Sequence, residues 1–175
     1  MKLAISLIFV ATLAQAECPA PPDISVAQDA LLAEAQALKN GREAQEISNQ
    51  LWALWARAPN EPAQALLDRG MAARASFDFV AATDALNKLV AYCPDYAEGY
   101  NQRAFVSFLR EDYDAALVDL DLALERQPKH VAAMSGKALT LMGLGRDKEA
   151  QDILREAVKL NPWIPEAGLL RDKEL

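Results

Sequence analysis

Apolar and small side chains recur along the chain with the spacing of paired amphipathic helices, and the pattern returns every 34 residues. Five sets of positions keep this interval: Gly70, Ala104 and Ala138; Ala82, Ala116 and Ala150; Leu86, Leu120 and Leu154; Val90, Leu124 and Val158; Pro94, Pro128 and Pro162. A fixed period of this length is typical of stacked helical hairpins. The sequence therefore predicts an all-α fold of antiparallel helix hairpins in three units, over residues 63–96, 97–130 and 131–164.

Each repeated position has a physical role in such a hairpin. The small residues let two helices cross closely, because a bulky side chain would push their axes apart. The leucine and valine positions form the apolar stripe of the second helix. Each proline ends that helix, since the ring cannot continue an α-helix and pushes the residue before it out of α geometry. Asp95 and Glu98 then indicate a capping box that begins the next helix.

These units resemble the tetratricopeptide repeat family over about residues 63–164. The middle unit carries the resemblance best, through Tyr100, Ala104, Tyr113, Ala116, Leu120, Ala123 and Pro128. Ala73 and Ser107 stand where the family has a tyrosine, and Asp147 where it has an aromatic residue, so we expect thinner packing there. The resemblance implies a right-handed superhelix in which the first helix of each unit lines a concave groove.

The segments on either side of the three units are expected to cap the stack. Residues 24–62 predict a degenerate N-terminal hairpin, in which Trp52 and Trp55 pack against the first unit rather than bind a partner. Residues 165–175 predict a closing helix. Residues 17–23 contain three prolines and predict an extended lead-in.

Residues 1–16 have the features of a secretory signal peptide. A positive start at Lys2 precedes an apolar run over residues 3–13, and a small-residue site predicts cleavage between Ala16 and Glu17. The run is about half of the ~20 residues that a membrane-spanning helix needs, so no stable membrane anchor is expected. Lipid attachment at Cys18 is disfavoured, because Glu17 stands where a lipoprotein signal has a small residue. We expect export, preferably to a bacterial periplasm.

Charge and cysteine content add two constraints. The formal charge is −7, and the charged residues are interspersed, which argues against nucleic-acid binding because phosphate contacts need clustered Lys and Arg. Cys18 and Cys93 are the two cysteines of the chain. In an oxidising compartment they form an intramolecular disulfide, remain unpaired or pair between molecules, and the sequence leaves these alternatives open.

No catalytic, metal-binding or cofactor-binding motif emerges from the sequence. The one histidine, His130, is expected at the surface or as a helix cap rather than as a catalytic base. Basic residues recur at Arg69, Arg103 and Lys137. We interpret them as partners of acidic residues on the second helices rather than as a stripe for an acidic ligand. The sequence predicts neither an enzyme nor a metal or cofactor site.

The resemblance places a peptide-binding groove on apolar and amide side chains of the first helices: Leu67, Met71, Asn101, Gln102, Phe105, Phe108, Leu139 and Met142. Phe105 and Phe108 supply the largest apolar area, although Phe108 is equally compatible with an inward position. The amides of Asn101 and Gln102 suit an extended backbone. The basic residues with which some relatives bind an acidic chain end are absent from the matching positions.

The function predicted from these residues is a non-catalytic adaptor that binds a segment of another exported protein. The alternative is a structural protein that self-associates into a homo-oligomer through the same apolar face, without a foreign ligand. An enzyme is the least favoured interpretation.

Overall fold

The computed structural model of the chain describes residues 17–171, so the expected signal peptide, with Ala16 at its cleavage site, and the last four residues lie outside the described part. Eight α-helices and a short 3-10 helix follow one another in this range: α1 (Ser25–Ala37), α2 (Ala44–Trp55), α3 (Glu61–Ala75), α4 (Phe79–Tyr92), α5 (Ala97–Leu109), α6 (Tyr113–Arg126), α7 (Val131–Gly143), α8 (Asp147–Leu160) and η1 (Pro165–Leu169).

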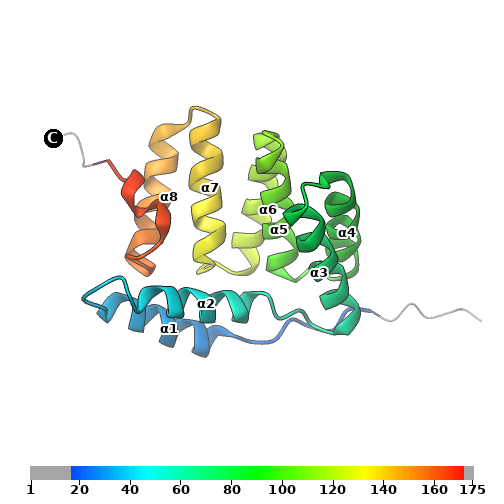
Figure 1. Cartoon of the computed structure of the whole chain (residues 1–175), viewed down its shortest axis with the longest axis horizontal. Coiled ribbons are helices and arrows are strands. Elements are labelled where there is room, and N and C mark those ends of the chain that lie inside the picture. The colour runs from blue at the N-terminus through cyan, green and yellow to red at the C-terminus, as the bar shows by residue number, and fades with distance from the viewer. Residues whose placement is uncertain (1–16, 172–175) are drawn as a thin grey trace, which may run out of the picture.

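Helices α3 to α8 stand side by side as three antiparallel hairpins, α3–α4, α5–α6 and α7–α8 (Figure 1). The second helices of the hairpins, α4, α6 and α8, begin at residues 79, 113 and 147, which are 34 residues apart. The predicted all-α fold of stacked helical hairpins is therefore confirmed. No strand occurs between residues 17 and 171, and no helix in that range is long and apolar enough to cross a bilayer.

The tight turns inside the hairpins repeat as closely as the helices do. Phe77, Glu111 and Gly145 occupy equivalent places and have positive φ angles of 61°, 59° and 71°. Only the glycine adopts this left-handed conformation without steric cost. The carboxylates of Asp78 and Asp112 then accept hydrogen bonds from the backbone at the start of the second helix, which caps α4 and α6.

Close helix crossing explains the small residues of the first helices. Gly70, Ala104 and Ala138 are all buried, and a Cβ added at Gly70 would lie 2.7 Å from Cγ of Leu86. Ala82, Ala116 and Ala150 of the second helices have no exposed surface. The hairpins therefore pack through small side chains, as the 34-residue pattern predicts.

The N-terminal segment departs from the repeat pattern, and we call residues 17–58 the N-terminal strap. Helices α1 and α2 run beneath the stack, along the loops that join the three units (Figure 1). Each of three successive loops donates a side-chain hydrogen bond to the strap: Tyr96 to the carbonyl oxygen of Trp55 (2.7 Å), Gln127 to Gln28 (2.6 Å) and Trp163 to the carbonyl oxygen of Ala35 (2.9 Å). The strap therefore spans the repeats instead of extending them.

The expected packing of Trp52 and Trp55 against the first unit is wrong. Both belong to an apolar core shared with α7 and α8 of the third unit, and Trp55 stacks on His130 with ring centroids 4.2 Å apart. The reason is the direction of the strap. It enters α3 at one end of the stack, and its helices lie back along the loops, so its apolar face covers the far unit.

A disulfide joins Cys18 to Cys93, with their Cα atoms 5.2 Å apart. Of the three alternatives that the sequence leaves open, the structure has the intramolecular bridge. It fixes the start of the strap to the end of α4, at the loop between the first and second units. At the other end of the chain, the expected closing helix is only the 3-10 turn η1 within the described residues.

Candidate ligand-binding groove

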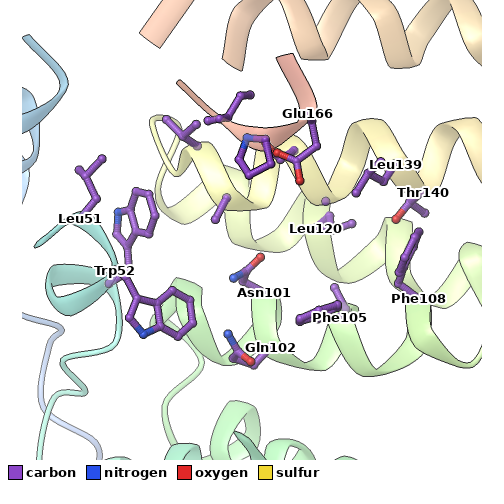
Figure 2. Close-up of a pocket in the computed structure, with 18 of the residues that line it drawn as sticks. Leu51, Trp52, Asn101, Gln102, Phe105, Phe108, Leu120, Leu139, Thr140 and Glu166 are labelled. Atoms are coloured by element: carbon purple, nitrogen blue, oxygen red, sulfur yellow. The ribbon is translucent and has the colours of Figure 1, made fainter. Parts of the chain in front are cut away.

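A cavity of about 470 Å³ lies between the repeats and the strap. Helices α5 and α7 supply most of its lining, α2 of the strap closes one side, and residues 164–166 close the end next to α8. Figure 2 shows Asn101, Gln102, Phe105 and Phe108 following one another along α5, with Trp52 facing the two amides from α2. The cavity therefore exists only because the strap and the repeats come together.

Aromatic side chains make the cavity largely apolar. Phe105 is 44% exposed, which is unusual for a phenylalanine on a helix of a folded core. Phe108 and Trp52 are partly buried and also line the cavity. The ring centroids of Phe108 and Tyr113 lie 5.6 Å apart. Phe108 therefore lines the cavity and also packs against Tyr113 of α6. Such an exposed apolar surface is typical of an interaction site.

The structure brings five of the predicted groove residues into the cavity lining and leaves three out. Those in the lining are Asn101, Gln102, Phe105, Phe108 and Leu139. The assignment of the other three is wrong. Leu67 has no exposed surface and packs in the core of the first unit, and Met71 and Met142 pack against cores at the cavity's edges. The packing of these three side chains against the cores keeps them out of the lining, although α3 and α7 both reach the cavity.

A buried polar cluster holds the two groove amides in place. The carboxylate of Glu98 is fully buried and accepts hydrogen bonds from Asn101 (3.0 Å), Gln102 and Nε2 of His130 (2.7 Å). Nδ1 of His130 accepts a hydrogen bond from the backbone N–H of Ala133, so the ring proton is assigned to Nε2. His130 is therefore a helix cap, and it is fully buried rather than on the surface.

The capping box expected from Asp95 and Glu98 is wrong. Tyr96, not Asp95, is the N-cap residue of α5, and it makes no side-chain capping bond. The Glu98 side chain turns inward to His130 instead of back to the start of the helix. In the sequence the Asp95–Glu98 spacing matches a cap, and nothing in it indicates that a histidine 32 residues later lies within reach. Burial of a carboxylate among three donors is a tertiary property.

Three polar atoms of residues in the cavity lining have no hydrogen-bond partner among the described residues. They are Oε1 of Gln102, Oγ of Ser135 and Oγ1 of Thr140, and each is buried. The amide nitrogen of Gln102 is already committed to Glu98, which leaves its oxygen as an acceptor. Buried polar atoms are nearly always hydrogen-bonded in folded proteins, so these three atoms are exceptions among the residues of the lining.

Arg74 is one of the cavity residues, with Trp52 and Glu166, that sequence reasoning missed. It comes from α3, and its guanidinium carbon lies 4.3 Å from the centre of the Phe105 ring. Burial lowers the pKa of Arg74, and the negative charge of Glu98 opposes that shift. The sequence signal was present but weak: Arg74 lies three residues after Met71, on the side of the helix already assigned to the groove.

Of the three recurring basic residues Arg69, Arg103 and Lys137, two form ion pairs with acidic residues of the second helices. Arg103 binds both carboxylate oxygens of Asp119 at 2.6 and 2.8 Å, and this hydrogen bonding raises the pKa of the arginine. Lys137 lies 2.6 Å from Asp121. Arg69 is exposed and forms no ion pair within residues 17–171. That range also contains no cluster of His, Cys, Asp and Glu suited to a metal ion.

Known proteins resemble this chain in sequence and in fold. A profile of the tetratricopeptide repeat matches residues 107–171. A TPR repeat-containing protein of Rhizobium etli is 28% identical over 120 residues, which is 69% of this chain and 59% of that protein. Residues 107–171 are thus similar to the tetratricopeptide repeat family. A tetratricopeptide repeat protein 36 homolog of Nematostella vectensis is 46% identical over 56 residues, so the chain spans between about a third and three fifths of these relatives.

Solved tetratricopeptide repeat structures share the fold. The TPR2B domain of yeast Sti1, solved as a complex with pHsp70, has a TM-score of 0.58 at 22% identity over 62% of this chain and 89% of that domain. The protein MamA has a TM-score of 0.54 at 21% identity, over 85% of this chain and 77% of its own. The first tetratricopeptide repeat domain of RPAP3, bound to the HSP90 peptide SRMEEVD, has a TM-score of 0.60 over 61% of this chain and 85% of that domain.

Proposed function

We propose that this helical-repeat protein is a non-catalytic scaffold that binds a polypeptide segment of another exported protein in the cavity between α5, α7 and the strap. The observation that carries the proposal is the cavity itself. Its lining combines the half-exposed Phe105 with Phe108, Trp52 and the amides of Asn101 and Gln102, which Glu98 holds in place. Apolar anchors with a few fixed polar groups are what a peptide or small-ligand site needs.

Two structural neighbours support a polypeptide as the ligand. The Sti1 domain is solved in complex with pHsp70 and the RPAP3 domain with an HSP90 peptide. In this chain the strap closes one side of the cavity, so a bound segment would reach it from the open side and occupy only a short length. The volume of about 470 Å³ agrees with a segment of a few residues.

We infer that the protein works outside the cytoplasm, in an oxidising compartment such as a bacterial periplasm. The Cys18–Cys93 disulfide supports this, because structural disulfides persist where thiols are not kept reduced. Fractionation of cells that express the chain, followed by mass spectrometry of its N-terminus, tests the inference. The expected product is periplasmic and begins at Glu17, whereas full-length protein in the cytoplasm would contradict it.

The binding proposal is tested by selecting peptides from a random display library on the purified protein. Phe105→Glu places a charge in the apolar cavity and should abolish the selection. Val118→Glu is the matched control, because Val118 is 61% exposed on α6 and does not line the cavity. Far-ultraviolet circular dichroism of both variants checks that the fold is kept.

Peptides that bind the wild type and the Val118→Glu protein, but not the Phe105→Glu protein, would support the proposal. Peptides that bind all three proteins equally would overturn it, since the binding surface would then lie elsewhere. Failure to select any peptide would also overturn it. In that case sedimentation at two concentrations would show whether a second copy of the chain occupies the apolar surface.

A further inference from the structure

Arg74 differs from the other basic residues in the described part of the chain. Most of them form ion pairs, and those that do not are otherwise all exposed: Lys39, Arg42, Arg57, Arg69, Arg110 and Lys148. Arg74 alone, between residues 17 and 171, is partly buried without an ion pair or a hydrogen bond from its side chain. Removing a charge from water without a partner costs free energy.

Glu166 is likewise the one acidic residue in the described part of the chain that is partly buried without an ion pair. The described carboxylates without an ion pair are exposed, and Glu166 is the exception: it is partly buried, and no cation lies within salt-bridge distance in residues 17–171. It lies in η1, and Figure 2 shows its side chain pointing down from that turn toward the cavity. The Glu166 side chain makes no hydrogen bond or ion pair with any of the described residues.

Both residues line the same cavity, from opposite ends of the stack. Arg74 is on α3 in the first unit, whereas Glu166 follows α8 at the end of the third (Figure 1). They do not pair with each other, and the apolar side chains of Phe105, Phe108 and Leu139 also line the cavity. The cavity therefore has a positive end, an apolar middle and a negative end.

We propose that the cavity selects a polypeptide segment with an acidic side chain and a basic side chain on opposite sides of an apolar one. The acidic group of the segment pairs with Arg74, the apolar group packs on Phe105 and Phe108, and the basic group pairs with Glu166. Charge complementarity of this kind fixes the orientation of the segment and excludes the reverse order. This rests on the proposed function, and it adds the chemistry of the partner and its direction of binding.

Arg74 is suited to this role by its contact with Phe105. The guanidinium carbon lies over the aromatic face, 4.3 Å from the ring centre, and the N–H groups of Arg74 make no hydrogen bond within the described residues, so they can bind a ligand carboxylate. A carboxylate bound there would be shielded from water on the side of the ring, which strengthens the ion pair relative to one on the open surface.

The test uses the same library on four proteins: wild type, Arg74→Glu, Glu166→Arg and the double variant. Arg69→Glu is the matched control, because Arg69 lies on α3, is exposed and does not line the cavity. Wild type and control should select peptides with an acidic and a basic residue flanking an apolar one. Each single variant should weaken a selected peptide by about tenfold, since one ion pair becomes a repulsion.

The double variant gives the decisive result, because it exchanges the charges of the two ends while keeping the fold and the net charge. It should select peptides with the reversed order of acidic and basic residues. If the selected peptides lose binding with Phe105→Glu but show no charge order, or the same order on the double variant, this proposal is overturned and the proposed function stands. If no peptide depends on Phe105, the proposed function fails first.

Discussion

At the residue scale, equivalent positions in the three units have diverged to hold the strap. Three residues that are 34 positions apart, Tyr96, His130 and Ile164, are the N-cap residues of the elements that follow the loops crossed by the strap. The hydroxyl of Tyr96 donates to a strap carbonyl, His130 stacks on Trp55, and Ile164 packs in the core shared with the strap. The 34-residue period therefore sets where each of these residues lies in its unit, and the type of side chain sets which contact it makes with the strap.

Gly70→Ala should destabilise the protein. The added Cβ would lie 2.7 Å from Cγ of the fully buried Leu86, so the hairpin must open or Leu86 must move. Overpacking of this kind costs about 1–3 kcal/mol, which is expected to exceed the gain of about 1 kcal/mol from replacing a helical glycine. Urea denaturation measures the change. Gly168→Ala, with nothing within 4 Å of the new atom, should stay within experimental error of wild type.

Tyr96→Phe should change the pH dependence of stability above pH 10. Burial, and then the charges of Glu98 and Asp68, raise the pKa of Tyr96 well above its ordinary value of 10.0. The unfolded chain therefore loses this proton first, so the stability that the neutral tyrosine provides is complete below pH 10 and lost as the pH rises further. The variant should lose about 1 kcal/mol at neutral pH with the hydrogen bond to Trp55.

The measurement for Tyr96 is the free energy of unfolding at pH values from 8 to about 11. The slope above pH 10 should be shallower in Tyr96→Phe than in wild type. Tyr113→Phe is the control, because the Tyr113 hydroxyl makes no hydrogen bond within the described residues. Equal slopes in wild type and Tyr96→Phe would contradict the assignment.

At the element scale, the strap is joined to the repeats by covalent, polar and apolar contacts in turn. The disulfide fixes its start to the first loop, hydrogen bonds join it to the second, and an apolar core joins it to the third unit. Gln36 adds hydrogen bonds to the last carbonyl oxygens of α8. The curvature of the repeat stack is thus held by an element outside the repeats.

Replacing both cysteines by alanine should destabilise the protein without unfolding it. The bridge closes a loop across a sequence separation of 75 residues, for which chain entropy gives a contribution of up to about 4 kcal/mol. Urea denaturation of the double variant measures the loss, and reduced wild type should give the same midpoint. A double variant as stable as the oxidised wild type would show that the strap is held by its other contacts alone.

At the scale of the whole molecule, the strap and the third unit form one cooperative core although they are far apart in the sequence. Leu32, Ile47 and Trp55 of the strap are buried together with Met134 of α7 and Leu154 of α8. The cavity lies next to this core, and α2 is its wall. Stability of the third unit and integrity of the cavity are therefore coupled.

Trp55→Ala should loosen the third unit more than the first, which follows it in the sequence. Removal of a buried tryptophan costs about 3–5 kcal/mol and leaves His130 without its stacking partner. Hydrogen exchange should rise most in α1, α2, α7 and α8. Val26→Ala, at a residue 83% exposed on α1, should leave exchange unchanged. Faster exchange confined to α3 and α4 would mean that the strap packs on the first unit after all.

The sequence by itself determined the repeating unit. The 34-residue period, the small residues at the helix crossings and the prolines that end the second helices are local properties, and they recur in each unit. It also indicated two aromatic residues of the groove, since Phe105 and Phe108 lie on the face of α5 that lines the cavity. The direction of the strap, the closure of the cavity, the buried Glu98–His130 pair and the role of Arg74 were decided by tertiary structure. Each depends on contacts between residues more than 25 positions apart, which no local period encodes.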